Sequence, residues 1–369
     1  MVSGPPYPEL DPDITLHKLP SLDLYNPEAL FRVPSLRELK DPINLLEWAS
    51  VSAGGFPEPL TFALRARKFL RENRHNYDMV HDNQTLAFGM LDIQDMIPLV
   101  TTIHHPITVD KQTELDAAPH IFARLRVHRW YAFLNMQTKV SQRLRTLVTV
   151  SQASRKDISE AFDVPEERFR IAHNGVNFEV FYPKQGVERE KNLIICTNSA
   201  DTPLKGLRYL IEAIDRIRQY RDIHLLVIGK PKEDGVIENL VRKLKIADNI
   251  TFTGRIEDEE FAGYYARATM AVVPSLYEGF GMPASEAMAC RVPVISTTGG
   301  ALPEVVGDTG LLVPPADVEA LEKAIVYLLD HPAERDRLAQ AGYERALECF
   351  TWRNTALQME EAYREALAC

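Results

Sequence analysis

The chain of 369 residues has the length of about two domains, and its 45% hydrophobic and 25% charged residues are usual for a soluble globular protein. Its net charge of −10 argues against general nucleic-acid binding, which requires a basic surface. No apolar run has the length of a membrane span, and no leader of signal-peptide type opens the chain, so we expect a cytoplasmic protein. The four cysteines are far apart and form no C-x-x-C pair, which predicts reduced thiols rather than a zinc site or a disulfide framework.

Residues 1–60 are rich in proline and predict mostly irregular structure. The exception is Asp13–Leu19, whose alternating and β-branched residues favour a strand. Asp11-Pro12-Asp13 has the D-x-D form of a metal-binding motif. Its place in a proline turn, with no strand ahead of it, indicates a turn instead.

The first half of the chain continues with one helix and several short strands. The pattern predicts an amphipathic helix over 60–71 and strands over 77–81, 96–103, 146–151 and 169–173. The strand over 96–103 ends at His104, which His105 follows. Because ligands of open α/β sheets lie at the carboxyl ends of strands, His104 is a candidate site residue. A histidine at a strand end is also often structural, and both interpretations stay open.

A basic region extends over 117–156, which contains no acidic residue and in which aromatic side chains alternate with arginines and lysines. One interpretation is a helix that docks on anionic lipid at the inner membrane face, or on a charged acceptor. The other is a packed helix with a solvated arginine face, and we favour it because the apolar residues could equally form core.

The second half has a clearer pattern. Residues 184–191 are charged and lack periodicity, as is typical of a linker. After them strands are predicted over 192–197, 223–228, 250–253, 269–273 and 292–296, with helices between them and further helices from residue 318 to the end. Regular alternation of strands and helices predicts a doubly wound parallel sheet.

One stretch of this half, 274–290, combines features of a phosphate site. An apolar strand leads into a glycine-broken loop, and Pro283 suits the first position of the helix that follows. Gly279 and Gly281 allow a tight turn and close approach of a ligand, and the free amides of the helix start suit a phosphate. Glu278 and Glu286 flank the glycines and can each reach a hydroxyl-rich group. The alternative is an ordinary strand–loop–helix connection with two surface glutamates.

The frame E-G-F-G-M-P-x-x-E-A-M-A at Glu278–Ala289 resembles the signature of the retaining glycosyltransferases of family 4, which have the GT-B fold. The segments over 293–296, 299–306 and 310–315 resemble that family too, whereas Arg291 replaces its usual glycine. The resemblance implies an α/β protein with two Rossmann-like doubly wound domains facing a cleft. It places the acceptor-side domain at 1–183, the nucleotide-sugar domain at 184–350 and a helix that returns to the first domain at 351–369.

The resemblance also implies roles for particular residues, without a metal or other cofactor. Glu278 would hold the transferred sugar and its developing positive charge, Glu286 the ribose, and His104 would line the sugar pocket. Lys205 would neutralise the donor diphosphate, although the family's preceding arginine is replaced by Ser199 or Ala200. The remaining donor-binding positions are Gly279, Phe280, Gly281, Met282, Asn198, Gly254 and Arg255, the last two beside the base.

Members of this family begin with a strand, a glycine-rich loop and a helix, and the present sequence shows no such opening. We therefore expect a first domain incomplete at its N-terminus, with unpaired strand edges that weaken folding or favour an oligomer. Three explanations stay open: a misassigned start, a natural or cut fragment, and a complementing chain that supplies the missing unit. The leading hypothesis is a glycosyltransferase that uses a nucleoside-diphosphate-sugar and an acceptor saccharide, lipid or small molecule. The alternatives are a weakly active or inactive nucleotide-sugar-binding subunit and another GT-B enzyme, such as an epimerase or a phosphorylase. The donor's base and sugar and the acceptor stay open.

Overall fold

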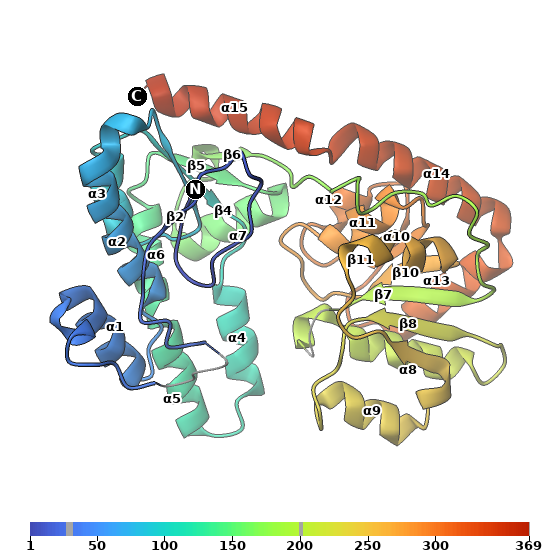
Figure 1. Cartoon of the computed structure of the whole chain (residues 1–369). Helices are drawn as coiled ribbons and strands as arrows, with labels where there is room; N and C mark the ends of the chain where they lie inside the picture. Colours follow the sequence, from blue (N-terminus) through green and yellow to red (C-terminus); the bar gives the residue numbers. More distant parts are fainter. Residues whose placement is uncertain (27–31, 199–201, 369) are drawn as a thin grey trace. The chain divides into compact units, whose positions relative to one another are not determined.

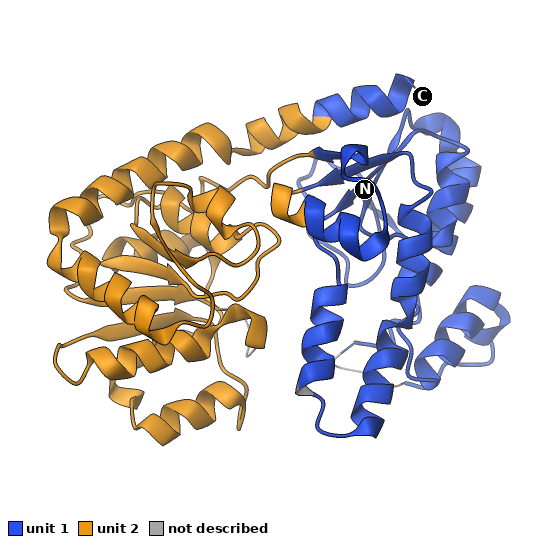
Figure 2. Ribbon diagram, turned by 180° about the vertical axis from the view of Figure 1, so that it is seen from behind, with its two compact units in different colours: residues 1–149, 155–170, 360–369 blue, residues 150–154, 171–359 orange. Residues whose placement is uncertain are grey.

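The computed structural model of the chain describes residues 1–26, 32–198 and 202–368 (Figure 1). The chain divides into two compact units, which are described separately (Figure 2). Unit 1 comprises Met1–Thr149, Arg155–Arg170 and Glu360–Cys369, and unit 2 comprises Val150–Ser154 and Ile171–Met359. Within the described residues, no helix is both long enough and apolar enough to cross a membrane.

Unit 1 contains a two-stranded parallel sheet, β1–β2, and a four-stranded sheet in the order β3-β4-β5-β6. The strands are β1 Val2–Ser3, β2 His17–Lys18, β3 Val80–Asn83, β4 Leu99–Ile103, β5 Thr146–Thr149 and β6 Phe169–Ile171. The helices are α1 Pro42–Ser52, α2 Glu58–Asn73, α3 Phe88–Gln94, α4 Thr108–Ala117, α5 Ile121–Trp130, α6 Leu134–Ser141 and α7 Gln152–Phe162. Helices α2 and α3 pack on the core that β4 and β5 contribute, through Leu70, Ile93 and Leu147.

Unit 2 is built on a six-stranded parallel sheet in the order β12-β11-β10-β7-β8-β9. Its strands are β7 Leu193–Thr197, β8 His224–Ile228, β9 Ile250–Phe252, β10 Met270–Val273, β11 Val294–Thr297 and β12 Leu311–Val313. Its helices are α8 Leu207–Ile217, α9 Val236–Leu244, α10 Asp258–Arg267, α11 Met282–Ala289, α12 Leu302–Val306, α13 Val318–Asp330 and α14 Pro332–Cys349. Helix α15, Trp352–Ala368, starts in unit 2 and ends in unit 1.

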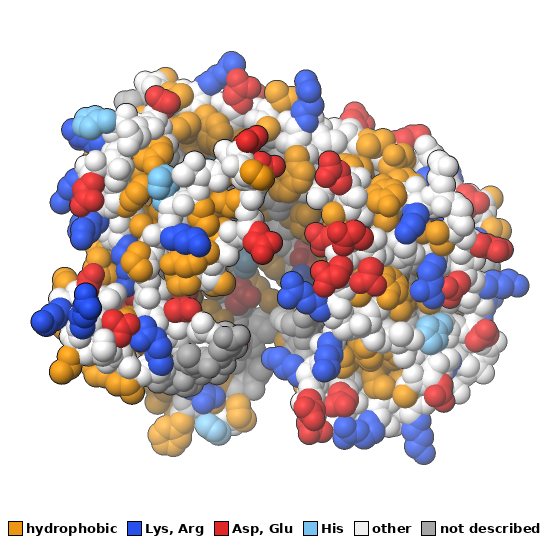
Figure 3. Space-filling view, in the orientation of Figure 1, with side chains coloured by type: hydrophobic (Ala, Val, Ile, Leu, Met, Phe, Trp, Pro, Cys, Tyr) orange, Lys and Arg blue, Asp and Glu red, His pale blue; other side chains and the backbone are white. Residues whose placement is uncertain are grey.

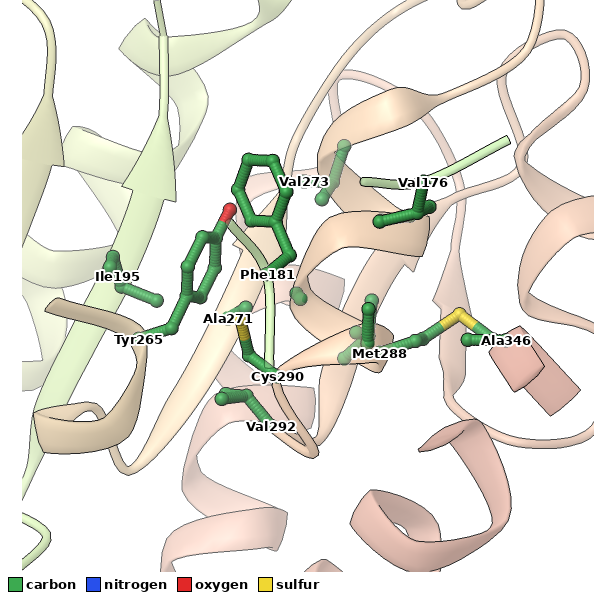
Figure 4. Close-up of a cluster of buried hydrophobic side chains, with 14 of the residues drawn as sticks. Val176, Phe181, Ile195, Tyr265, Ala271, Val273, Met288, Cys290, Val292 and Ala346 are labelled. Carbon is green, nitrogen blue, oxygen red and sulfur yellow. The ribbon is translucent and has the colours of Figure 1, made fainter. Parts of the chain in front are cut away.

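Both faces of the unit 2 sheet are buried, as expected for a parallel sheet covered by helices. Because side chains alternate along a strand, Leu193 and Ile195 belong to one core, and Ile194 and Cys196 to the other. Figure 4 shows part of the first core, in which Met288 of α11 is packed. The predicted α/β class with two Rossmann-like domains is confirmed, and α11 packs on the core of unit 2.

Two local predictions for residues 1–60 have different outcomes. The turn at Asp11 is confirmed, because its carboxylate accepts the Asp13 N–H at 3.0 Å and its carbonyl accepts the Ile14 N–H at 2.9 Å. The irregular structure expected beyond it is wrong for α1. There Asp41 caps the helix by accepting the Ile43 N–H at 2.8 Å, and Pro42 occupies the first helical position.

Candidate active site

The order of strands in unit 2 sets the place of a site. The chain lays down β7, β8 and β9 in one direction and then returns to place β10 on the other side of β7. The loops after β7 and β10 therefore leave the sheet side by side and in opposite senses, which opens a crevice at the carboxyl ends of these strands. Lys205 lies in the loop after β7, and Glu278 lies in the loop after β10.

Hydrogen bonds and glycines hold these two loops together. The Leu276 N–H donates to the Leu204 carbonyl at 2.7 Å. Gly206 has a φ of +64° and lies so close to the Pro274 carbonyl that a Cβ at this position would overlap it. The two loops can approach this closely only because residue 206 has no side chain.

The loop after β11 supports Glu278 from another side. The Ala301 N–H donates to the Glu278 carbonyl at 2.9 Å. Gly300, with a φ of +62°, packs so tightly on the same carbonyl that a Cβ would overlap it. The position of Glu278 therefore depends on a glycine that follows β11, beyond helix α11 in the sequence.

Substitution of Gly300 by alanine is expected to lower the free energy of unfolding by about 2–3 kcal/mol, because strain at positive φ is added to a backbone overlap. Gly186→Ala is the matched control, since Gly186 has a φ of +75° and no atom within 4 Å of the added Cβ. We expect the control to lose only about 1 kcal/mol in urea unfolding. Equal losses in the two variants would show that the Glu278 loop does not need the close approach.

Glu278 is buried and held by two donors. Its Oε1 accepts from the Lys205 ammonium at 2.8 Å and from the Ser275 hydroxyl at 2.7 Å. The structure thus brings Lys205 to Glu278, where an ion pair with limited access to water is worth more than an exposed one. Ser275, which the sequence did not identify as a site residue, lies three residues before the glutamate that it positions.

Glu286, in the second turn of α11, is partly buried, and its carboxyl group has no hydrogen-bond or ion-pair partner among the described residues. Burial, followed by the charge of Glu278, raises the pKa of Glu286 to about 7, and Lys205 opposes that shift. A carboxyl group in this state can donate or accept a hydrogen bond near neutral pH. It is therefore equipped to bind a polar ligand group.

The N-terminus of α11 follows the glycine loop as predicted. Gly281 has a φ of +105°, and among the described residues no group accepts the N–H groups of Phe280, Gly281 or Met282. The Phe280 side chain is buried and packs edge-on against Phe350, so only its backbone can serve a ligand. Free amides at a positive helix end suit an anion such as a phosphate.

Gly279 has no positive φ, and its position depends on two serines far away in the sequence. Its carbonyl accepts from the Ser151 hydroxyl at 2.6 Å and from the Ser154 hydroxyl at 2.7 Å. The neighbouring amides of Gln152 and Ala153 donate to the Glu304 carboxylate at 2.9 and 3.0 Å. The segment Val150–Ser154 of unit 2 thus fixes the glycine loop, a contact that no local pattern in the sequence predicts.

Three predicted donor-binding residues lie at the ends of β7 and β9. The Asn198 N–H donates to the Ile228 carbonyl at 2.9 Å, and the Gly254 N–H donates to the Gly229 carbonyl at 3.1 Å, which brings the ends of β7, β8 and β9 together. Arg255 follows Gly254 and is exposed. A small pocket here has the lining residues Asn198, Leu207, Val227, Lys230, Pro231, Ile237 and Phe252. The positions of Ser199 and Ala200 lie outside the described residues.

His104 belongs to unit 1 and follows β4. Its backbone N–H donates to Gln84 Oε1, and its ring Nε2 hydrogen-bonds with Asn83 Oδ1, both at 2.7 Å, so the end of β3 holds both the backbone and the ring of His104. Burial, together with the nearby His105, lowers the pKa of His104, which keeps the imidazole neutral at physiological pH. His105 instead approaches Asp110 at 3.3 Å.

The basic region of the sequence forms separate helices, of which α5 is the most exposed. Phe122, Ile121 and Leu125 on α5 are 75%, 63% and 56% exposed, so these apolar side chains are not core. In Figure 3, apolar, basic and histidine side chains lie together at the end of unit 1 where Figure 1 draws α5. The arginine face is solvated, as favoured from the sequence, but the accompanying apolar residues are exposed as well.

Comparisons with known proteins agree with this geometry. The family model described as Glycosyl transferases group 1 matches residues 179–345, and that described as Glycosyltransferase Family 4 matches residues 30–180. The MMP α-(1→4)-mannosyltransferase of Mycolicibacterium hassiacum is 44% identical over 371 residues, covering 99% of this chain and 90% of the relative. The O-antigen chain mannosyltransferase B of Escherichia coli is 28% identical over 303 residues, covering 78% and 79%.

Solved structures show the same architecture. Sucrose-phosphate synthase from Thermosynechococcus elongatus aligns with a TM-score of 0.71 at 25% identity, covering 97% of this chain and 86% of that one. Anabaena HepE in complex with UDP and glucose aligns with a TM-score of 0.66 at 17% identity, covering 95% and 86%. At that identity the second likeness concerns the fold alone.

Proposed function

The chain belongs to the group 1, family 4 glycosyltransferases, and from this premise we propose that it transfers mannose from a nucleoside-diphosphate-mannose to a saccharide acceptor in α-(1→4) linkage, with retention of configuration. Two mannosyltransferases among its relatives support the sugar, and the first supports the linkage. The observation that carries the proposal is the meeting of Lys205, Glu278 and the α11 N-terminus at the switch point of the unit 2 sheet.

In the proposed donor complex, the diphosphate lies on the free amides of Phe280, Gly281 and Met282. Glu286 then bonds the ribose, and the donor's hydroxyls become the partners that its carboxyl group lacks among the described residues. Asn198, Gly254 and Arg255 lie beside the base. Lys205 and the amides supply the positive charge that a divalent cation would otherwise bring, so we expect transfer without a metal.

The proposed reaction breaks the bond between the anomeric carbon and the phosphate oxygen, and the acceptor oxygen bonds to that carbon on the same face. The acceptor's proton passes to the leaving phosphate oxygen. Glu278, held by Ser275, stabilises the positive charge that develops on the sugar. Lys205 can transfer its hydrogen bond from Glu278 to the leaving diphosphate. His104, neutral and fixed by Asn83, is proposed to bond a sugar hydroxyl.

The test is to incubate the purified chain with methyl α-mannoside as the acceptor and one donor at a time. The donors are GDP-mannose, UDP-glucose and ADP-glucose, and each reaction is run with and without EDTA. We expect mass spectrometry to detect a mannosylated product that EDTA does not remove, and NMR to show an α-(1→4) bond. Transfer of glucose alone would contradict the proposed sugar, and loss of product with EDTA would contradict metal independence. Calorimetric binding of a donor with neither transfer nor hydrolysis would favour a nucleotide-sugar-binding subunit.

A further inference from the structure

Two buried serines hold one carbonyl of the glycine loop. Ser151 and Ser154 are both 0% exposed, and their hydroxyls donate to the Gly279 carbonyl at 2.6 and 2.7 Å. The Ser151 oxygen also accepts the Ser154 N–H at 2.9 Å, so its own hydrogen stays available for the loop. One donor is enough to satisfy a buried carbonyl, and a second donor fixes the direction in which that carbonyl points.

The segment that carries the serines has a support of its own. Ser151 precedes α7 and caps it by accepting the N–H of the third helical residue, Ser154. The first two amides of α7 donate to the Glu304 carboxylate at 2.9 and 3.0 Å. Glu304 lies in α12, where its carbonyl accepts from the Arg345 guanidinium at 2.7 Å. These bonds hold the two hydroxyls in place without using the glycine loop.

The direction of the Gly279 carbonyl decides where the next N–H points. The bond from Gly279 to Phe280 is trans, because the cis bond found among the described residues is Pro5–Pro6. In a planar trans peptide the C=O and the following N–H point in opposite directions. The Phe280 N–H, which has no acceptor among the described residues, therefore faces away from both serines. It is one of the amides that the proposed donor complex gives to the diphosphate.

We propose that Ser151 and Ser154 are positioning residues of the donor site, a role that rests on the proposed function: they aim the Phe280 N–H at the donor diphosphate without touching the donor. Glycine gives residue 279 a wide choice of backbone angles, and a peptide that turned over would present its carbonyl oxygen to the phosphates. The two hydroxyls oppose that rotation. They also polarise the peptide, which makes its N–H a stronger donor to the leaving diphosphate as negative charge builds there.

A purely structural role of the serines predicts a different result. The Phe280 side chain is buried against Phe350 and would keep the loop packed, so loss of the hydroxyls would lower stability alone. Ser141 of α6 provides the matched control for such a loss. It is 0% exposed, its hydroxyl donates to the Gln137 carbonyl at 2.8 Å, and it belongs to unit 1. Ser141→Ala removes a comparable buried bond that has no connection with the glycine loop.

The test is calorimetric binding of GDP, UDP and ADP to the full chain and to its variants. For the diphosphate that the parent binds best, we expect Kd to rise about threefold in Ser151→Ala and in Ser154→Ala, because one hydroxyl still holds the carbonyl. In the double variant Kd should rise at least about thirtyfold, more than the product of the single changes, since the peptide can then turn over. Ser141→Ala should bind as the parent does.

A second readout follows the amide itself, by NMR of a chain labelled with heavy nitrogen at phenylalanine. We expect the Phe280 amide proton to move downfield when the diphosphate binds to the parent, and equally in Ser141→Ala. In the double variant at saturating diphosphate it should stay where it is, because its N–H no longer faces the phosphates. Neither readout requires sugar transfer.

Unchanged affinity in the double variant, or a Phe280 amide that moves as in the parent, would overturn the role of the serines and leave the proposed transfer intact. If the double variant does not fold, single variants that bind as tightly as Ser141→Ala overturn it equally. A parent that binds a diphosphate but transfers no sugar would contradict the proposed function, whereas weaker binding by the double variant would still support the serines. A parent that binds none of the three diphosphates would contradict both.

Discussion

Replacing Glu278 with glutamine is expected to lower the rate of sugar transfer by about 10²–10³-fold, while donor binding changes little. Glutamine has the same shape and can still accept from Ser275, so the loop keeps its conformation. The negative charge that we propose stabilises the sugar in the transition state is lost. Because the ground-state donor carries no such positive charge, the loss appears in kcat and not in donor affinity.

The control for this prediction is Glu212→Gln on α8. Glu212 forms an ion pair with Arg208 one turn earlier on the same helix, at 3.3 Å, and takes no part in the Glu278 loop. Its activity should equal that of the parent. Turnover measured by mass spectrometry at saturating donor, together with calorimetric donor affinity, separates the two effects. A Glu278→Gln variant that keeps more than half of the parent activity would remove Glu278 from the reaction.

Replacing Glu286 with glutamine is expected to have opposite effects on stability and on donor binding. Its carboxyl pKa is about 7 in the folded chain, against an ordinary value of 4.5 that applies when the chain unfolds. Below pH 4.5 both states hold the proton, and the carboxyl group does not alter stability. Between pH 4.5 and 7 the unfolded state releases the proton first, so the free energy of unfolding falls as pH rises. Above pH 7 Glu286 is ionised in both states, so its destabilisation of the folded chain has reached its full size and no longer changes with pH.

Glutamine cannot ionise, so the Glu286→Gln variant avoids this loss. We expect it to exceed the parent in stability by on the order of 1–3 kcal/mol at pH 8, and to equal it near pH 4, in urea unfolding. In the same variant, donor binding should weaken by about 1–3 kcal/mol, since the charged hydrogen bond that we propose to the ribose would be replaced by a neutral one. A stability gain independent of pH would refute the buried-carboxyl explanation, and unchanged affinity in calorimetry would refute the ribose role.

Local sequence patterns predicted much of this molecule. The five strands expected in unit 2 occur within two residues of their predicted starts, because β-branched runs between helices are local signals. The strand, glycine loop and helix around Glu278 were also predicted, although α11 begins at Met282, so that Pro283 is its second residue and not its first. Strand β12 and helix α1 were not predicted, although Asp41 followed by Pro42, the first residue of α1, is a usual helix start.

The contacts that position the site could not be predicted in the same way. Ser151 reaches Gly279 across 128 residues, and Gly300 supports Glu278 through a loop after another strand. Such contacts depend on the order of strands in the sheet, which the alternation of elements does not specify. From the sequence we expected Lys205 to bind the diphosphate. The structure shows in addition that Lys205 pairs with Glu278, which was not predicted.

The tight contact of Gly206, Gly299 and Gly300 with the backbone over 274–278 has a consequence for engineering of this enzyme. A library that varies these three glycines should yield almost entirely inactive proteins, because any side chain there overlaps the backbone of the Glu278 loop. Lys230 and Pro231, which line the pocket beside Asn198, do not make these contacts.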